Sequence, residues 1–204
     1  MNLLLTGFEP FGGAEINPSE QVARVLDGSV IAGCQVVSCI LPVDRAAGPR
    51  ALLDAVAARN PRAVVCLGEH SGLARVAVER VAVNLLDFRI ADNAGEVVTD
   101  QPVFPGGPAA YFATLPVRAI HQAVTAMGIP CELSLSAGSF LCNQVMYTLL
   151  HHAASSPGLL GGFIHLPALP SQAAKASRPL PSMSVETSAS AVFKALEMVA
   201  LALA

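Results

Sequence analysis

The chain has 204 residues, 53% of them hydrophobic and only 13% charged, and it carries a formal net charge of −3. This length fits one unit with a sizeable core, so we expect residues 1–204 to form a single domain. With no basic run, 5% aromatic residues and no Trp, the composition speaks against nucleic acid as a partner. No apolar stretch is long enough to span a bilayer unbroken, and the first residues lack the basic start of a secretion signal, so no membrane segment is expected.

Alternating strand-like and helix-like segments run through the first half of the chain. Strands are expected at residues 2–6, 35–41 and 63–67. The third strand is a continuous apolar run of the kind buried on both faces of a parallel sheet. A helix is expected to begin at Pro18, with Asn17 as its N-cap and Glu20 completing a capping box. Residues 44–58 are expected to form the next helix.

The second half continues the alternation. Strands are expected within the valine-rich segment 74–86 and at 129–135 and 162–166, helices at 111–127, 145–150 and 184–203, and loops at 92–108 and 167–181. This order predicts an α/β fold: a three-layer α/β/α domain around a twisted, mostly parallel mixed sheet. Sites in such sheets form beyond the carboxyl ends of strands. The loops beginning at Gly7 and Gly68, the turn before Cys142, and His165 should therefore share one edge.

The chain contains five cysteines, an odd number, and no Cys-x-x-Cys pair. This pattern speaks against a disulfide framework and against a structural zinc site. We therefore expect reduced thiols and a cytoplasmic protein.

Cys142 follows a small-residue turn at 136–139 and should lie in the first turn of a helix. The unpaired N–H groups there and the positive end of the helix dipole favour a thiolate, the form of Cys that attacks carbonyl carbon. The alternative is a buried structural thiol, the usual role of a free Cys, which suits the other four cysteines better. The small and polar neighbours of Cys142 favour the nucleophile.

A nucleophilic Cys needs a base, usually a His. His165 closes an apolar strand at the expected edge and is the preferred candidate, although a hydrogen-bonded core His has the same pattern. His70 lies on a loop and stays possible. The other three lie on helices, away from the expected edge: His121, His151 and His152.

Glu79 is a candidate for the third group, which orients the imidazole. Alternation along the valine-rich segment puts its carboxylate on an apolar face, which is costly unless the charge is paired. His165 would be such a partner, and so would Arg75 or Arg80 if the strand bends.

The glycine-bearing loop 6–13 lacks the signatures of a phosphate-binding loop. It offers Phe8 and Phe11, which suit a small, flat, weakly polar ligand or simply anchor the loop in the core.

Seven segments, in this order, carry a resemblance to a known family. They are Thr-Gly-Phe-Glu-Pro-Phe-Gly-Gly at 6–13, Asn-Pro-Ser at 17–19, Val-Glu-Arg-Val-Ala-Val-Asn at 78–84, Arg-Ile-Ala-Asp-Asn at 89–93, Tyr-Phe-Ala-Thr-Leu-Pro-Val-Arg-Ala-Ile at 111–120, Ser-Ala-Gly-Ser-Phe-Leu-Cys-Asn at 136–143 and Gly-Phe-Ile-His-Leu-Pro at 162–167. Together they resemble pyroglutamyl peptidase I, also called pyrrolidone-carboxylate peptidase.

The resemblance implies a cysteine exopeptidase that removes an N-terminal pyroglutamyl residue from peptides without metal or cofactor. It implies Cys142 as nucleophile, His165 as general base and acid, and Glu79 as the residue that orients the imidazole. The backbone N–H of Cys142 and the side chain of Arg89 would stabilise the oxyanion. The lactam ring would be bound by five residues: Phe8, Phe11, Asn17, Ile90 and Phe140. The resemblance also implies a homodimer or homotetramer.

Two positions depart from the pattern of the family. Ala77 stands where Ser or Thr is usual, and Ser71 stands where Gly, Ala or Pro is usual, within an unusual loop at 69–72. Family members use the backbone of this loop to contact the lactam. The departures therefore bear on the detail of substrate binding and leave the implied triad intact.

Two other functions stay open on such a scaffold. A nucleoside phosphorylase would need a phosphate site, and none is readable in the sequence. A non-catalytic ligand-binding protein would keep the pocket but would not need Cys142, His165 and Glu79 together.

Overall fold

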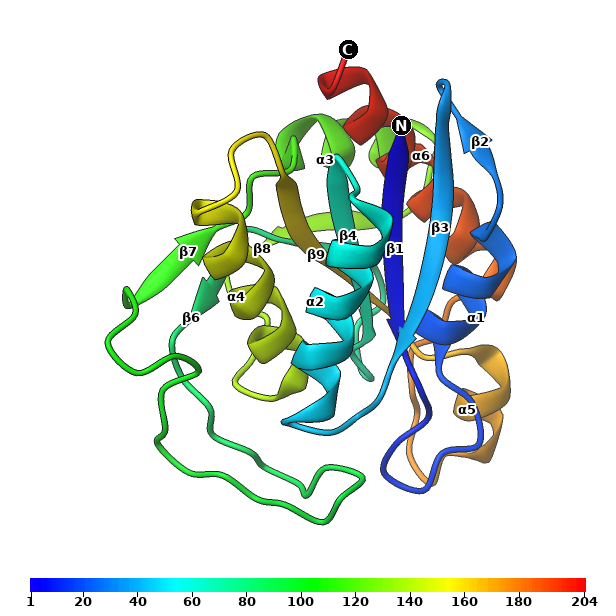
Figure 1. Cartoon of the computed structure of the whole chain (residues 1–204). Helices are drawn as coiled ribbons and strands as arrows, with labels where there is room; N and C mark the ends of the chain where they lie inside the picture. Colours follow the sequence, from blue (N-terminus) through cyan, green and yellow to red (C-terminus); the bar gives the residue numbers. More distant parts are fainter.

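The computed structural model describes every residue from 1 to 204 and shows a sheet with helices on both faces (Figure 1). The strands are β1 (Asn2–Phe8), β2 (Val30–Ile31), β3 (Cys34–Leu41), β4 (Ala63–Glu69), β5 (Val76–Glu79), β6 (Val81–Val83), β7 (Ala110–Phe112), β8 (Cys131–Ser134) and β9 (Leu160–Leu166). The helices are α1 (Pro18–Leu26), α2 (Ala47–Arg59), α3 (Val117–Ala126), α4 (Leu141–Ala154), α5 (Pro170–Lys175) and α6 (Val185–Ala202). Seven strands form the main sheet in the order β2-β3-β1-β4-β9-β5-β8, and β6 pairs only with β7. The expected α/β fold with a mostly parallel mixed sheet is confirmed.

Different helices bury the two faces of this sheet. α1, α3 and α6 pack together on one face, and α2 packs beside α4 on the other (Figure 1). In β4, Val65 and Leu67 belong to the core beneath the first set of helices, whereas Val64 and Cys66 belong to the core beneath the second. The apolar run at 63–67 is therefore buried on both faces, as predicted. No helix combines the length and the apolar composition that crossing a bilayer requires.

Strand direction decides which loops meet at the site. β3, β1, β4 and β9 are parallel neighbours, so their carboxyl ends share one edge of the sheet. β5 is antiparallel to β9, and β8 is parallel to β5, so β8 ends at the opposite edge. The turn before Cys142 was expected to lie at the shared edge because the strand before it would end there. That strand is β8, and it ends at the opposite edge, so this part of the expectation is wrong. Residues 135–140 cross back to that edge, where α4 begins.

The observed helices and strands bear on four local expectations. The valine-rich segment 74–86 forms two strands, β5 and β6, one of the two expected outcomes. The helix expected from residue 111 begins only after Pro116, because β7 occupies the start of that segment and pairs with β6. α5 occupies part of 167–181, which was expected to be a loop. Glu20 completes no capping box and instead pairs with Arg24 one turn later, at 2.8 Å.

Candidate active site

Cys142 is the second residue of α4, whose N-cap residue is Phe140. The N-cap makes no side-chain hydrogen bond, and the first turn contains no acidic residue. The first N–H groups of the helix therefore have no intrahelical acceptor and can bind an anion, and the positive end of the helix dipole lies beside the sulfur. Negative charge that develops next to Cys142 is best stabilised at this end of a helix.

The carboxyl end of β4 packs directly against this thiol. A Cβ atom at Gly68 would lie 2.9 Å from Sγ of Cys142 and 2.7 Å from Cζ of Phe163, both closer than Cβ atoms pack. Glycine is thus the residue that lets β4 and α4 approach so closely. Gly68 also lies opposite His165 in the register of β4 and β9, which brings the imidazole next to the thiol.

His165 and Glu79 form a buried pair behind the thiol. Nδ1 of His165 lies 2.8 Å from Oε1 of Glu79, and their side chains are only 5% and 1% exposed. The antiparallel register of β5 and β9 produces this pair by placing Ala77 opposite His165, two residues from Glu79. Of the partners considered for Glu79, the structure selects the histidine. Arg75 instead pairs with Glu132 on β8, at 3.5 Å.

The surroundings of His165 favour its charged form. Burial by itself lowers the pKa of His165, but the charge and hydrogen bond of Cys142, together with those of Glu79, outweigh burial and raise the pKa to about 9. The second carboxylate oxygen of Glu79, Oε2, is buried without a hydrogen-bond partner. No other donor therefore shares this carboxylate with His165.

A second histidine lies beside the pair. The ring centroids of His70 and His165 are 5.3 Å apart, with the rings edge to face. Burial, and then the charge on His165, lower the pKa of His70 below its usual value. His70 therefore lies next to the site, but of the two rings only His165 is hydrogen-bonded to a carboxylate. This contact favours His165 over His70 as the base.

Two adjoining cavities meet at the thiol. The larger one, the catalytic cavity, has a volume of about 430 Å³, and its lining includes Cys142, His165, Arg89, Ile90, Phe11 and Phe140. The smaller one, the inner pocket, has a volume of about 20 Å³, and its mainly apolar lining includes Cys142, Phe8, Phe11, Asn17 and Phe140. The structure thus brings every residue expected at the site to these cavities, with Glu79 directly behind His165.

Aromatic contacts and the N-cap residue of α1 hold the walls of the inner pocket in place. Phe140 packs 6.4 Å from Phe11 and 4.6 Å from the buried Phe88, measured between ring centroids. Phe88 was not anticipated from the sequence. Asn17 is buried and caps α1 as expected, with its Oδ1 accepting the N–H of Ser19 at 2.9 Å. The polar face of this pocket is therefore already hydrogen-bonded within the protein.

Asn143 has a structural role at the site that the sequence reasoning missed. Its fully buried amide accepts the N–H of Val83 at 2.9 Å and donates to the carbonyls of Val83 at 2.9 Å and Leu85 at 3.0 Å. These bonds join α4, next to Cys142, to the segment that leads to Arg89. The available signal was an amide in the first turn of a largely apolar helix.

The fold and the site together define a class of protein: a cysteine hydrolase on an α/β/α scaffold. The thiol lies at a helix start, and an imidazole–carboxylate pair is buried beside it. The structure contains no group of three or more His, Cys, Asp or Glu side chains arranged to hold a metal ion.

Comparisons with known proteins identify the family. The family model described as pyroglutamyl peptidase matches residues 1–202. A pyrrolidone-carboxylate peptidase of Escherichia fergusonii is 47% identical over 185 residues, which cover 91% of this chain and 86% of that relative. The solved pyrrolidone carboxyl peptidase of Pyrococcus furiosus is 40% identical, with a TM-score of 0.97 over 100% of both chains. Pyroglutamyl peptidase I of Bacillus amyloliquefaciens is 35% identical, with a TM-score of 0.95 over 98% of this chain and 97% of that one.

The chain therefore belongs to the pyroglutamyl peptidase family, a family of cysteine peptidases. The resemblance seen in the sequence is confirmed, and the nucleoside phosphorylase alternative is removed.

Proposed function

We propose that this protein removes the pyroglutamyl group from the N-terminus of peptides, with residues 1–204 acting as one catalytic domain. One observation carries the proposal: the buried His165–Glu79 pair, joined at 2.8 Å, lies beside the Cys142 thiol at the mouth of a small apolar pocket. The names of the relatives and the family support the same activity. Cys142 is the nucleophile, His165 the general base and acid, and Glu79 the residue that orients the imidazole.

The first half of the reaction transfers the acyl group to the enzyme. Sγ of Cys142 attacks the pyroglutamyl carbonyl carbon, and the carbonyl oxygen becomes an oxyanion. The backbone N–H of Cys142 and the side chain of Arg89 stabilise this charge, and each such donor contributes about 3–4 kcal/mol. His165 then gives its proton to the peptide nitrogen, the C–N bond breaks, and a thioester remains on Cys142.

The second half returns the enzyme to its starting state. Water enters the catalytic cavity and attacks the thioester carbonyl while His165 accepts a proton from it. Pyroglutamate leaves with Sγ of Cys142 as the thiolate leaving group, and the proton stays on His165 for the next cycle. Glu79 keeps the imidazole in one orientation during both halves, because its Oε1 holds Nδ1.

The apolar rings of the inner pocket and of the adjoining catalytic cavity account for the choice of an uncharged lactam. They are those of Phe8, Phe11 and Phe140. The two polar members of the inner pocket already have partners: Asn17 caps α1, and Glu69 accepts hydrogen bonds from Ser71 and Gln172. Ile90 extends the apolar wall into the catalytic cavity. An unmodified N-terminal glutamate would bring an ammonium and a carboxylate into these surroundings, where unpaired charges are strongly disfavoured.

The same chain is proposed to act as a homo-oligomer, a homodimer or homotetramer. Three large apolar side chains at the margins of the sheets are highly exposed: Val30 at 70%, Phe112 at 70% and Leu135 at 66%. Contact between copies would remove such apolar surface from water. Light scattering coupled to gel filtration is expected to give a mass of two or four times 21.0 kDa, and a mass of one chain would contradict this proposal.

The activity is tested with a pyroglutamyl arylamide, whose cleavage releases a coloured or fluorescent amine. We expect hydrolysis that iodoacetamide abolishes and that a chelator leaves unchanged, because a thiol attacks and no step of the proposed mechanism uses a metal. Activity that survives alkylation and is lost to the chelator would contradict the mechanism. A lack of any hydrolysis by the untreated protein would contradict the activity itself.

A further inference from the structure

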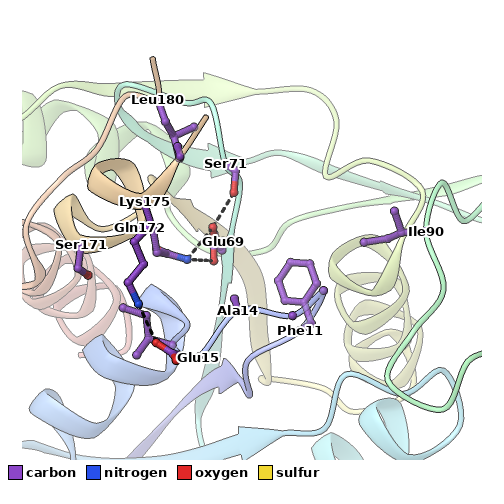
Figure 2. A pocket seen from close by; sticks show the side chains of 14 residues that line it. Phe11, Ala14, Glu15, Glu69, Ser71, Ile90, Ser171, Gln172, Lys175 and Leu180 are labelled. Atoms are coloured by element: carbon purple, nitrogen blue, oxygen red, sulfur yellow. Dashed lines mark hydrogen bonds and ion pairs between the residues drawn. The ribbon is translucent and has the colours of Figure 1, made fainter. Parts of the chain in front are cut away.

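A third hollow, the outer groove, extends the catalytic cavity away from the inner pocket. It lies between the loop after β1 and helix α5 and has a volume of about 590 Å³, which is within the range of about 300–1,000 Å³ typical of ligand sites. Figure 2 shows Phe11 on one side, Gln172 and Lys175 of α5 on the other, and Glu69 between them.

The outer groove is continuous with the catalytic cavity. The two share four lining residues: Phe11, Glu69, Ser71 and Ile90. The inner pocket also borders Phe11 and Glu69, but its volume of about 20 Å³ is far too small for a peptide chain. A peptide attacked by Cys142 therefore lies in the catalytic cavity, and the outer groove is the large space that continues this cavity past Glu69.

Glu69 marks the entrance to this groove and is held there by neutral partners. Its carboxylate accepts the Ser71 hydroxyl and, at 3.1 and 3.2 Å, the side-chain amide of Gln172. Gln172 is fixed in turn, because its carbonyl oxygen accepts the N–H of Leu169 at 2.7 Å. Figure 2 shows these bonds joining the end of β4 to α5. The carboxylate is thus fixed in position without a cation to neutralise it.

The groove as a whole carries one negative charge. Its charged lining residues are Glu15, Glu69 and Lys175, and Lys175 pairs with Glu15 at 2.8 Å (Figure 2). Glu69 is therefore the uncompensated charge, and it stands at the junction with the catalytic cavity. A basic side chain near this junction would gain a partner, and an acidic one would be repelled.

We propose that the outer groove binds the part of the peptide that follows the pyroglutamyl group, and that Glu69 makes a basic residue preferred directly after that group. This inference rests on the proposed function and adds a second determinant of specificity to it. The apolar rings beside Cys142 select the terminal lactam, and Glu69 selects the charge of the next side chain.

The test compares kcat/KM for pyroglutamyl peptides that differ only in the residue after the ring, Lys, Ala or Glu, at low ionic strength. The variant is Glu69→Gln, which keeps the size of the side chain. The control is Asp54→Asn, which removes a more exposed carboxylate from α2, outside the three cavities, where Asp54 lies 3.8 Å from Arg50. We expect the wild-type order Lys, Ala, Glu, and a Lys-to-Glu ratio that falls about fivefold or more in Glu69→Gln but not in Asp54→Asn.

Added salt should reduce the same ratio in the wild type, because screening weakens exposed charge pairs. The inference is overturned if the wild type cleaves the Lys and Glu peptides equally well, or if Glu69→Gln leaves the ratio unchanged. Hydrolysis of the neutral pyroglutamyl arylamide by the wild type separates these outcomes from a failure of the proposed function. Cleavage of the arylamide without a charge preference rejects only the role of Glu69.

Discussion

The side chains that we propose to react and the walls around them are held in different ways. Cys142, His165 and Glu79 project from α4, β9 and β5, whose backbones are hydrogen-bonded within a helix and a sheet. We call these three elements the frame of the site. The walls come mainly from the loops after β1, β4, β6 and β8 and from α5, a helix of only six residues. These loops are held by single side chains such as Asn17, Asn143 and Gln172.

This difference separates chemistry from selectivity. A shift of a core strand disturbs close packing, so the distances among the reacting atoms are strongly constrained. A changed residue in a wall loop can alter what the site binds without moving those atoms. The departures from the family pattern divide in the same way: Ser71 lies in a wall loop, whereas Ala77 lies inside β5 and faces the pair.

The strongest test of the frame is removal of the nucleophile. Cys142→Ser should lower kcat for the pyroglutamyl arylamide by at least about 10³-fold, because a serine hydroxyl is a far weaker nucleophile beside an imidazole arranged for a thiolate. The matched control is Cys131→Ser, since burial raises the pKa of the Cys131 thiol to about 11 and makes it inert. Equal activity of both variants, with intact circular dichroism spectra, would reject Cys142 as nucleophile.

The second test removes the charge behind the imidazole. Glu79→Gln should lower kcat by about 10³-fold, because the neutral amide no longer stabilises or orients the charged ring. It should also lower the pKa of His165 from about 9, because burial still lowers that pKa and the contribution of Glu79 is lost.

The pH dependence of activity tests the direction of this change in the pKa of His165. A raised pKa keeps the proton on His165 up to about pH 9, and protonation of the leaving amine needs that proton. Activity of the wild type should therefore decline as pH rises through about 9, and the decline in Glu79→Gln should begin at a lower pH. An alkaline limb that stays in place would show that Glu79 does not act on His165. Glu96→Gln, a charge change at an exposed ion pair, serves as the control.

The third test concerns Asn143, which connects α4 of the frame to the wall segment that leads to Arg89. Asn143→Ala removes three hydrogen bonds and leaves partly buried backbone groups of Val83 and Leu85 without their partner, so it should lower the free energy of unfolding by about 2 kcal/mol. It should also lower kcat, because Arg89 loses its support. Chemical denaturation and arylamide kinetics measure the two effects.

Asn84 offers a matched control, because it too makes three hydrogen bonds to the backbone of a loop, at Phe104 and Gly107. That loop lies outside the catalytic cavity. Asn84→Ala should therefore cost stability and leave kcat unchanged. If both variants lower kcat equally, loss of stability alone explains the effect of Asn143→Ala.

The same division describes what the sequence could predict. The frame is encoded locally: the apolar run at 63–67 and the small-residue turn before Cys142 predict a strand and a helix start from neighbours in sequence. The family motifs then named the residues that the structure brings together. The direction of β8 was not readable, because it depends on pairing with β5, and short strands have no local signal for the direction of their partner.

The wall contacts were not readable for the same reason. Glu69 and Gln172 are 103 positions apart, and Asn143 and Val83 are 60 positions apart. An amide or a carboxylate at such positions gives no indication of its partner until the fold is known. β7 was missed because tertiary pairing with β6 overrides the helical propensity of the residues before Pro116.

The smallest effect is expected in the wall of the inner pocket. Phe11→Ala should raise KM for the arylamide by about tenfold, or about 1.4 kcal/mol, because the apolar lactam surface that packs on Phe11 is left in contact with water. kcat should change little, because the thiol and its partners stand on α4, β9 and β5. Phe104→Ala, which removes a half-exposed ring packed on His151, should change neither constant. A large fall in kcat with unchanged KM in Phe11→Ala would mean that this wall also positions the reacting atoms, and the separation of frame and wall would not hold.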